Sequence, residues 1–112
     1  MIAIKIDVVR RTVAIIAMGN TLLDFYRHID CNVMEAVYPR GLDPRDRLYV
    51  DEEGLLHGIN HFFTIEGYPQ QLAGNGLIVG HNEEGESVDA HTALEVVLPK
   101  IKFLGRKMVV PK

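Results

Sequence analysis

The histidines His57 and His61 are four residues apart, which is the spacing in this chain closest to that of a metal site. On a helix they would share one face and supply half of a tetrahedral zinc site, with Asn60 and Glu66 as nearby oxygen donors. Gly58 lies between them, however, and glycine disfavours a helix. The local sequence supplies no third strong ligand. We therefore expect ordinary surface or partly buried histidines, and we predict no bound metal and no other cofactor.

Two further histidines, His81 and His91, would join such a site only if the fold brings them in. Cys31 could form a nucleophilic pair with a histidine, since such a pair is formed in space. It follows the end of a predicted helix, however, whereas a thiol is activated at a helix N-terminus. The acidic runs Asp51–Glu53 and Glu83–Glu86 hold paired carboxylates but fall in predicted exposed turns. We expect solvated turns and an inert cysteine, and we predict no catalytic residue.

The segment Gly67–Gly76 combines three glycines, a proline and an asparagine, which is typical of a structured loop. Its end, Gly74-Asn75-Gly76, resembles part of a phosphate-binding loop. The P-loop lysine and the dinucleotide glycine spacing are absent, and a predicted strand follows. These differences argue against a nucleotide triphosphatase or a dehydrogenase. A tight turn explains the glycines most simply, although backbone amides in such a loop can also bind an anion.

Half of the eight aromatic residues lie around this loop, between Tyr49 and Tyr68. Core packing explains them most simply. The alternative is a ligand or partner pocket that uses tyrosine hydroxyls and side-chain amides. The predicted binding residues are Tyr49, Asn60, Phe62, Tyr68, Gln71, Gly74, Asn75 and Gly76.

The length of 112 residues fits one globular domain, which we place at residues 1–112. The formal net charge of −3 disfavours binding to duplex nucleic acid, which usually requires a basic excess. One stretch, Lys100–Lys112, holds five basic residues and no acid. A solvated tail or a strand edge guarded by lysines explains it most simply, and contact with an acidic partner is the alternative.

The chain has a single cysteine, which excludes an intramolecular disulfide and favours a reducing compartment. The N-terminal sequence lacks a charged leader before an apolar run, so it does not resemble a signal peptide. The longest apolar run, Val13–Met18, is far shorter than the roughly 20 residues that span a bilayer. We therefore expect a cytoplasmic protein that contacts no membrane.

The hydrophobic pattern predicts short strands mixed with short helices. The predicted strands are Ile2–Val9, Thr12–Met18, Val33–Tyr38, Arg47–Val50 and Leu77–Val79, with the first two forming a hairpin in which the second strand is the more buried. The predicted helices are Thr21–Ile29 and Ala90–Leu98. The segment Leu55–Ile65 is ambiguous, with apolar spacing nearer to a helical period, and residues 103–110 form a closing strand or hairpin. The irregular order predicts an α+β fold with a small, mostly antiparallel sheet and two or three short helices.

The order of several short motifs resembles that of a known protein family. The motifs are Leu48-Tyr-Val-Asp-Glu-Glu-Gly-Leu55, Gly58-Ile-Asn60, Gly67-Tyr-Pro69, Leu72-Ala-Gly74, Gly76-Leu-Ile-Val-Gly80 and Asn82-Glu-Glu-Gly85. This order is similar to that of a family of small proteins of unknown function carried by bacteriophages and mobile elements. The resemblance covers roughly Ile2–Leu98 and is most specific at Asp51–Asn60 and Leu72–Gly80, so Pro99–Lys112 looks like an extension. It implies a small α+β accessory protein and no established activity.

These observations favour a non-enzymatic binding protein over an enzyme. We expect an accessory or counter-defence factor that binds a host protein or a small ligand, and that can form homo-oligomers. The first alternative is a small hydrolase or nuclease, dependent on a metal or on histidines and carboxylates. The second is a nucleic-acid-binding protein that uses the basic C-terminal stretch, which the acidic net charge disfavours.

Overall fold

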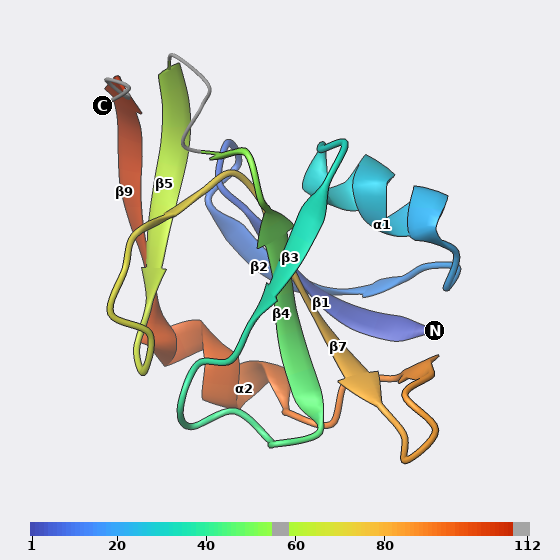
Figure 1. Cartoon of the computed structure of the whole chain (residues 1–112). Coiled ribbons are helices and arrows are strands. Elements are labelled where there is room, and N and C mark those ends of the chain that lie inside the picture. Colours follow the sequence, from blue (N-terminus) through green and yellow to red (C-terminus); the bar gives the residue numbers. More distant parts are fainter. Residues whose placement is uncertain (55–58, 109–112) are drawn as a thin grey trace.

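The strands of this protein form two antiparallel sheets, shown in Figure 1. The structure is a computed structural model that describes the backbone of residues 1–54 and 59–108 and the side chains of residues 1–54 and 61–105. The larger sheet contains β1 (Ile2–Asp7), β2 (Thr12–Ala17), β3 (Met34–Val37), β4 (Asp46–Asp51), β7 (Gly76–His81) and β8 (Ser87–Val88). The smaller sheet contains β5 (Ile59–Ile65), β6 (Leu72–Ala73) and β9 (Ile101–Met108). The helical segments are α1 (Leu22–Ile29), α2 (Leu94–Val97) and the 3-10 turn η2 (Leu98–Lys100).

Neighbouring strands follow the order β2–β1–β7–β4–β3 in the larger sheet, with β8 beside the end of β7, and β6–β5–β9 in the smaller sheet. Every strand pairing among the described residues is antiparallel. The predicted sheet-dominated, mostly antiparallel architecture is therefore confirmed. In the described part of the chain, no helix is long and apolar enough to cross a bilayer.

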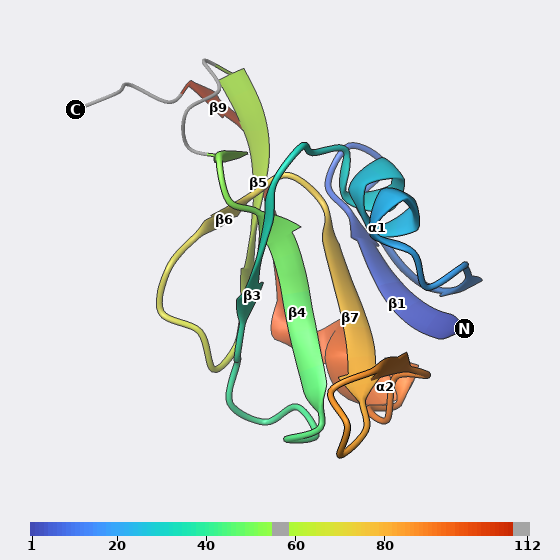
Figure 2. The ribbon, with the colours of Figure 1, turned by 45° about the vertical axis from the view of Figure 1, so that its right-hand side comes forward.

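The larger sheet lies between the smaller sheet on one face and α1 on the other, as Figure 2 shows. Successive side chains of a strand point to opposite faces. In β1, Ile4 and Ile6 belong to the same buried cluster as Phe63 of β5, whereas Ala3 belongs to the cluster that contains Phe25 of α1. Strand β7 is central and is buried at every residue, because both of its faces are covered.

Local sequence signals set the limits of α1. The Thr21 hydroxyl accepts a hydrogen bond from the backbone N–H of Asp24 at 3.2 Å, and the Asp24 carboxylate accepts one from the backbone N–H of Thr21 at 3.2 Å. This reciprocal pair is a capping box. Phe25 and Ile29 are buried against the sheet, and the helix ends where Asp30 adopts a left-handed φ of 62°. The predicted helix is confirmed.

The helical interpretation of Leu55–Ile65 is wrong for the residues that the structure describes, because residues 59–65 form β5. Residues 55–58 lie outside the described part. The pairing register of β5 and β9 shifts between Phe62 and Phe63, and Gly105, opposite Phe62, has a φ of 77°. This bulge buries both aromatic side chains. Consecutive buried residues remove the two-residue alternation by which a strand is recognised in sequence.

Three other predicted elements differ in detail. The hairpin of β1 and β2 is confirmed, with Arg11 at a positive φ of 55° in its turn, but β2 is an exposed edge strand and not the more buried one. The predicted helix Ala90–Leu98 is reduced to α2 and η2. Its first residues are not helical, because the backbone of Ala93 is extended and α2 begins only after it. Of the two C-terminal alternatives, the single closing strand β9 is the one formed as far as residue 108.

Asn75 links three elements of this fold. Its Oδ1 accepts a hydrogen bond from the backbone N–H of Val8, just after β1, at 3.0 Å. Its Nδ2 donates to the carbonyl oxygen of His28, in the last turn of α1, at 3.3 Å. Since Asn75 immediately precedes β7, its amide group joins the larger sheet to the helix that covers one of its faces.

We expect Asn75→Ala to lower the free energy of unfolding by about 1–3 kcal/mol, because two partly buried backbone groups lose their partner. Urea unfolding followed by circular dichroism measures the change. Asn20→Ala, an exposed position in the loop before α1, is the matched control and should change stability by less than about 0.5 kcal/mol. If both variants were as stable as the parent, the two bonds of Asn75 would contribute nothing to the fold.

Candidate functional site

The structure distributes the predicted binding residues over several places. Tyr68 and Gln71 line a hollow of about 70 Å³ beside β6. Gly74 and Asn75 line a separate hollow of about 160 Å³ between the ends of β1 and α1. The side chain of Asn60 lies outside the described residues.

The other predicted residues, Tyr49, Phe62 and Gly76, contribute to packing. Phe62 is buried. A Cβ atom at Gly76 would lie 2.9 Å from Cδ1 of Leu48 and 3.2 Å from Cζ of Phe63, so a side chain here would require these core side chains to shift. Tyr49 contacts His81, as described below. The predicted residues that the structure describes therefore do not line one common hollow.

Asp51 is only 8% exposed, which corrects the predicted exposed acidic turn at this residue. Its Oδ1 accepts a hydrogen bond from the backbone N–H of Glu53 at 2.9 Å. Asp51 and Cys31 line a hollow of about 120 Å³. Burial, and then the nearby Asp51 charge, raises the pKa of the Cys31 thiol to about 11. The thiol is therefore protonated at neutral pH, which is the opposite of an activated nucleophile.

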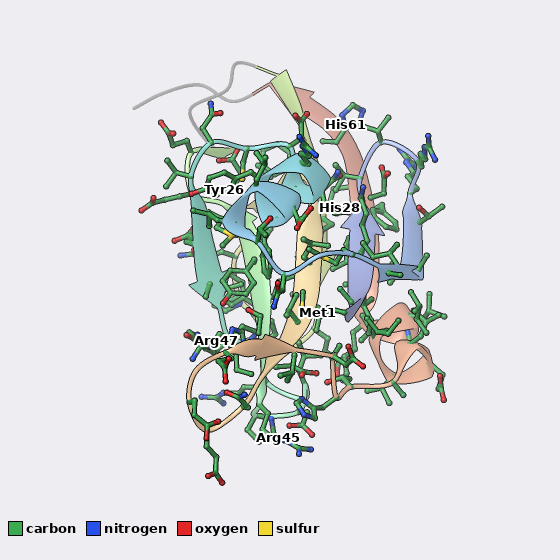
Figure 3. All side chains as sticks on the ribbon, turned by 90° about the vertical axis from the view of Figure 1, so that its right-hand side faces the viewer. Met1, Tyr26, His28, Arg45, Arg47 and His61 are labelled. Atoms are coloured by element: carbon green, nitrogen blue, oxygen red, sulfur yellow. The ribbon has the colours of Figure 1, made fainter. Side chains whose placement is uncertain are left out.

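A larger hollow of about 460 Å³ lies where β4 begins and β7 ends. The sheet brings these ends together, because Asp46 of β4 is paired with Gly80 of β7. Figure 3 shows Arg45 and Arg47 at this end of the molecule and His61 toward the other end. The volume lies within the usual range for small-ligand sites. The lining residues are Pro44, Arg45, Arg47, His81, Asn82, Glu83, Val88 and His91.

A buried carboxylate, Asp46, organises one wall of this hollow. Its side chain has no exposed surface and accepts hydrogen bonds from the backbone N–H groups of His91 and Thr92, at 2.9 and 2.7 Å. The Thr92 hydroxyl donates to Oδ2 at 2.6 Å, and the His91 ring contacts Oδ1 through Nδ1 at 3.0 Å. These bonds offset the cost of burying a carboxylate.

The Asp46 contact also determines how His91 can act. An ionised carboxylate only accepts hydrogen bonds, so Nδ1 of His91 must carry a proton. The second ring nitrogen, Nε2, is then an acceptor in the neutral ring and a donor in the protonated ring. Because the His91 side chain is 24% exposed and lines the hollow, its ring is accessible to a ligand.

Gly80 is what allows His91 to lie against the end of β7. A Cβ atom at position 80 would meet the carbonyl oxygen of Asp89 at 2.2 Å and Nδ1 of His91 at 2.7 Å. Contacts this short do not occur, so any side chain here would displace the segment that carries His91. Gly80 therefore allows the backbone of β7 and the backbone of the segment before His91 to approach closely.

His81 forms the opposite wall. Its Nε2 lies 2.8 Å from the hydroxyl of Tyr49, and Tyr49 in turn packs edge-on against Phe25 of α1, with ring centroids 5.3 Å apart. Nδ1 of His81 is buried and has no hydrogen-bond partner among the described residues. Burial, and then the positive charge of Arg47, lowers the pKa of His81 below its ordinary value of 6.5. His81 is therefore neutral at physiological pH.

The two arginines of the hollow have different surroundings. Arg45 makes a two-point contact with Asp43, with Nε to Oδ1 at 3.0 Å and Nη2 to Oδ2 at 2.9 Å. That contact holds the pKa of Asp43 well below its usual range. In the part of the chain that the structure describes, no carboxylate pairs with Arg47. The unpaired guanidinium of Arg47 and the ring of His91 are thus the main groups available to an anion.

The predicted absence of a metal site stays a prediction. His57 lies outside the described residues and His61 lies in β5, so the proposed pair cannot be assessed. Among the residues that are described, no group of three or more histidine, cysteine or carboxylate side chains is arranged to hold a metal ion. Of the basic C-terminal stretch, only the side chains of Lys100 and Lys102 are described, and its contact with an acidic partner remains a prediction as well.

The fold and the hollow together define a small two-sheet domain with a histidine- and arginine-lined site at one end of its larger sheet. A family model described as "Domain of unknown function (DUF3846)" matches residues 1–97, and the chain therefore belongs to this family. The matched region includes every residue that lines the hollow. It ends before β9, although β9 completes the smaller sheet. No curated protein and no solved structure is significantly similar to the chain.

Sequence reasoning did not single out Arg45, Asp46 and Arg47, and it considered His81 and His91 only for a metal site. Some signal was present. The three charged residues stand together where a predicted strand begins, and His81 directly follows a glycine at the end of another. The sequence did not reveal that Asp46 pairs with Gly80, and this pairing places the two strand ends side by side.

We expect Asp46→Asn to lower the free energy of unfolding by about 1–3 kcal/mol, since an amide supplies a donor where the loop presents only donors. Asp43→Asn is the control, because it changes a solvent-accessible ion pair, with the Arg45 and Asp43 side chains 63% and 24% exposed, that is worth at most about 1 kcal/mol. Chemical denaturation of both variants gives the comparison. Equal effects would mean that the buried carboxylate is no more important than the surface pair.

The lowered pKa of His81 predicts a pH dependence of stability. The ring is easier to protonate in the unfolded chain, so the stabilisation present above pH 6.5 is lost as the pH falls through the folded pKa. We expect the free energy of unfolding to fall on acidification from neutral pH, and to fall less in His81→Gln. Burial also lowers the pKa of His28, so this residue contributes in the same direction and the variant isolates His81. An NMR titration in which the His81 ring protonates at or above 6.5 would contradict the prediction.

Proposed function

We propose that this protein is a non-enzymatic accessory protein that binds a small ligand, and that the ligand presents an anionic group to the hollow at the start of β4. The observation that carries the proposal is the arrangement of Arg47 and His91 around one concave site of about 460 Å³. An arginine that has no carboxylate partner among the described residues and a histidine that donates when protonated suit a phosphate or a carboxylate.

The shape of the hollow supports a small ligand rather than a large surface. Its walls include the apolar side chains of Pro44 and Val88 beside the charged groups. Ligand sites of this size combine apolar walls with a few polar groups that fix orientation. Glu83, on the exposed β7–β8 turn, is the acidic residue of the lining and would repel a second negative charge at that side. The proposed ligand therefore has its anionic group at one end.

The resemblance in motif order supports the further proposal that the protein belongs to a bacteriophage or mobile element and acts there as an accessory or counter-defence factor. In that setting, binding would sequester the ligand or recognise the same group on a host protein. The genes that flank the coding sequence test this part. Neighbours of chromosomal housekeeping type only would argue against it.

The binding proposal is tested with inorganic phosphate and a simple phosphate monoester as probes. We expect amide NMR shifts at Arg47, His81 and His91, and a loss of affinity of about tenfold or more in Arg47→Gln, the effect of removing one charge-assisted hydrogen bond. Arg27→Gln, at an exposed position of α1, should bind as the parent does. Shifts that cluster elsewhere, or equal losses in both variants, would refute the proposed site.

The pairing of Asp46 with His91 supports one alternative, a small hydrolase in which His91 acts as a general base. A carboxylate that fixes the ring through Nδ1 is the arrangement that general-base histidines use. Among the described residues, however, the lining contains no serine, threonine, cysteine or lysine, so water would have to be the nucleophile. Turnover of p-nitrophenyl phosphate that disappears in His91→Gln would favour this alternative over simple binding.

A further inference from the structure

The edge of β2 has the properties of a strand that pairs with another chain. The larger sheet ends at β2, and no strand lies beyond it in the described part of the molecule. Its sequence, Thr12-Val-Ala-Ile-Ile-Ala17, has no charge, no proline and no bulge in its pairing with β1. Ile15 is 55% exposed. A regular apolar edge of this kind is a template for a further strand.

The other sheet edges are protected in the usual ways. Strand β3 is four residues long and carries Glu35 on its exposed side, and β6 is only two residues long. Strand β9 contains Lys102 and is interrupted by the bulge at Gly105. Short length, charges and bulges each discourage edge pairing. Strand β2 lacks all three, which sets it apart from the other edges that the structure describes.

The hydrogen bonds at the N-terminus show which groups of β2 face outward. Met1 and Met18 exchange both of their backbone hydrogen bonds, each at 2.9 Å. In an antiparallel pair such residues alternate with residues whose backbone groups point away. The backbone of Ile2, opposite Ala17, accordingly bonds on its other side to Asp89 and Ala90. It follows that Val13, Ile15 and Ala17 direct their N–H and C=O groups away from β1, toward the unpaired edge of the larger sheet.

We propose that β2 pairs antiparallel with β2 of a second copy of this chain, about a two-fold axis at Ile15. This register uses all three outward-facing residues. Ile15 lies opposite Ile15 of the second copy, and Val13 lies opposite Ala17 at each end. The interface joins the two larger sheets into one continuous sheet and buries the exposed Ile15 side chains against each other.

The ends of the strand favour a second copy over an unrelated partner. In the register centred on Ile15, Arg11 lies opposite Gly19 of the second copy. The Asp24 carboxylate lies beside Gly19, since a Cβ atom there would be 2.2 Å from Asp24 Oδ2. The basic turn at Arg10 and Arg11 therefore lies opposite the segment of the other copy that holds the Asp24 carboxylate, and the symmetry repeats this at both ends. A strand with an uncharged centre, a basic end and an acidic end is complementary to a second copy of itself only when the two strands are antiparallel.

Sedimentation of the full chain over a range of concentrations tests the association, and we expect a monomer–dimer equilibrium. Ile15→Lys places two like charges opposite each other and should leave only monomer, whereas Val9→Lys, a position 69% exposed outside the strand, should not change the equilibrium. A parent chain that is monomeric throughout would overturn the proposal. So would a dimer that both variants preserve or both abolish.

Disulfide trapping tests the register even if Ile15→Lys fails to fold. In a Cys31→Ser background, Ile15→Cys should oxidise to a covalent dimer, because the Cα atoms of a hydrogen-bonded pair lie about 5.5 Å apart, within disulfide range. Val13→Cys alone should not cross-link, while a mixture of Val13→Cys and Ala17→Cys should give the mixed dimer. Equal cross-linking of Ile15→Cys and Val13→Cys would indicate random collision and would overturn the proposed pairing.

Discussion

The buried carboxylate of Asp46 is the constraint on which the candidate site depends. It lies at the start of β4 and binds the backbone and side chains of His91 and Thr92, which are 45 and 46 residues further along the chain. A carboxylate in the interior must be fully hydrogen-bonded to be tolerated, so these donors cannot leave without a large cost. The same bonds hold His91 beside the hollow.

Close approaches at two glycines complete this arrangement. Gly76 lets the start of β7 approach Leu48, and Gly80 lets the end of β7 lie against the segment that carries His91. Both glycines belong to a strand covered on both faces, where space is most restricted. The central strand thus positions the core at one end and the candidate site at the other. In the loop predicted to bind a ligand, Asn75 links the end of β1 to the last turn of α1.

The elements that the sequence predicted well are those whose signals are local. The helix α1 is set by its own first turn, where Thr21 and Asp24 form a capping box, and the alternation of Ile4, Lys5 and Ile6 marks β1. Predictions were weakest where burial did not follow the local pattern. The bulge at Phe62 and Phe63 buries two neighbours of one strand and imitates a helical spacing.

The sequence by itself determined the antiparallel, sheet-dominated fold, the limits of α1, and the family-like order of motifs. Each of these depends on residues close together in the chain. Only the tertiary structure decided that Asp46, His81 and His91 share one hollow, because they meet through strand pairing and through a loop that passes over Gly80. It also decided that β2 is an edge, since its hydrophobic pattern suits a buried strand equally well. Pairing between strands that are far apart in the chain depends on the whole fold, so it cannot be predicted from any short segment.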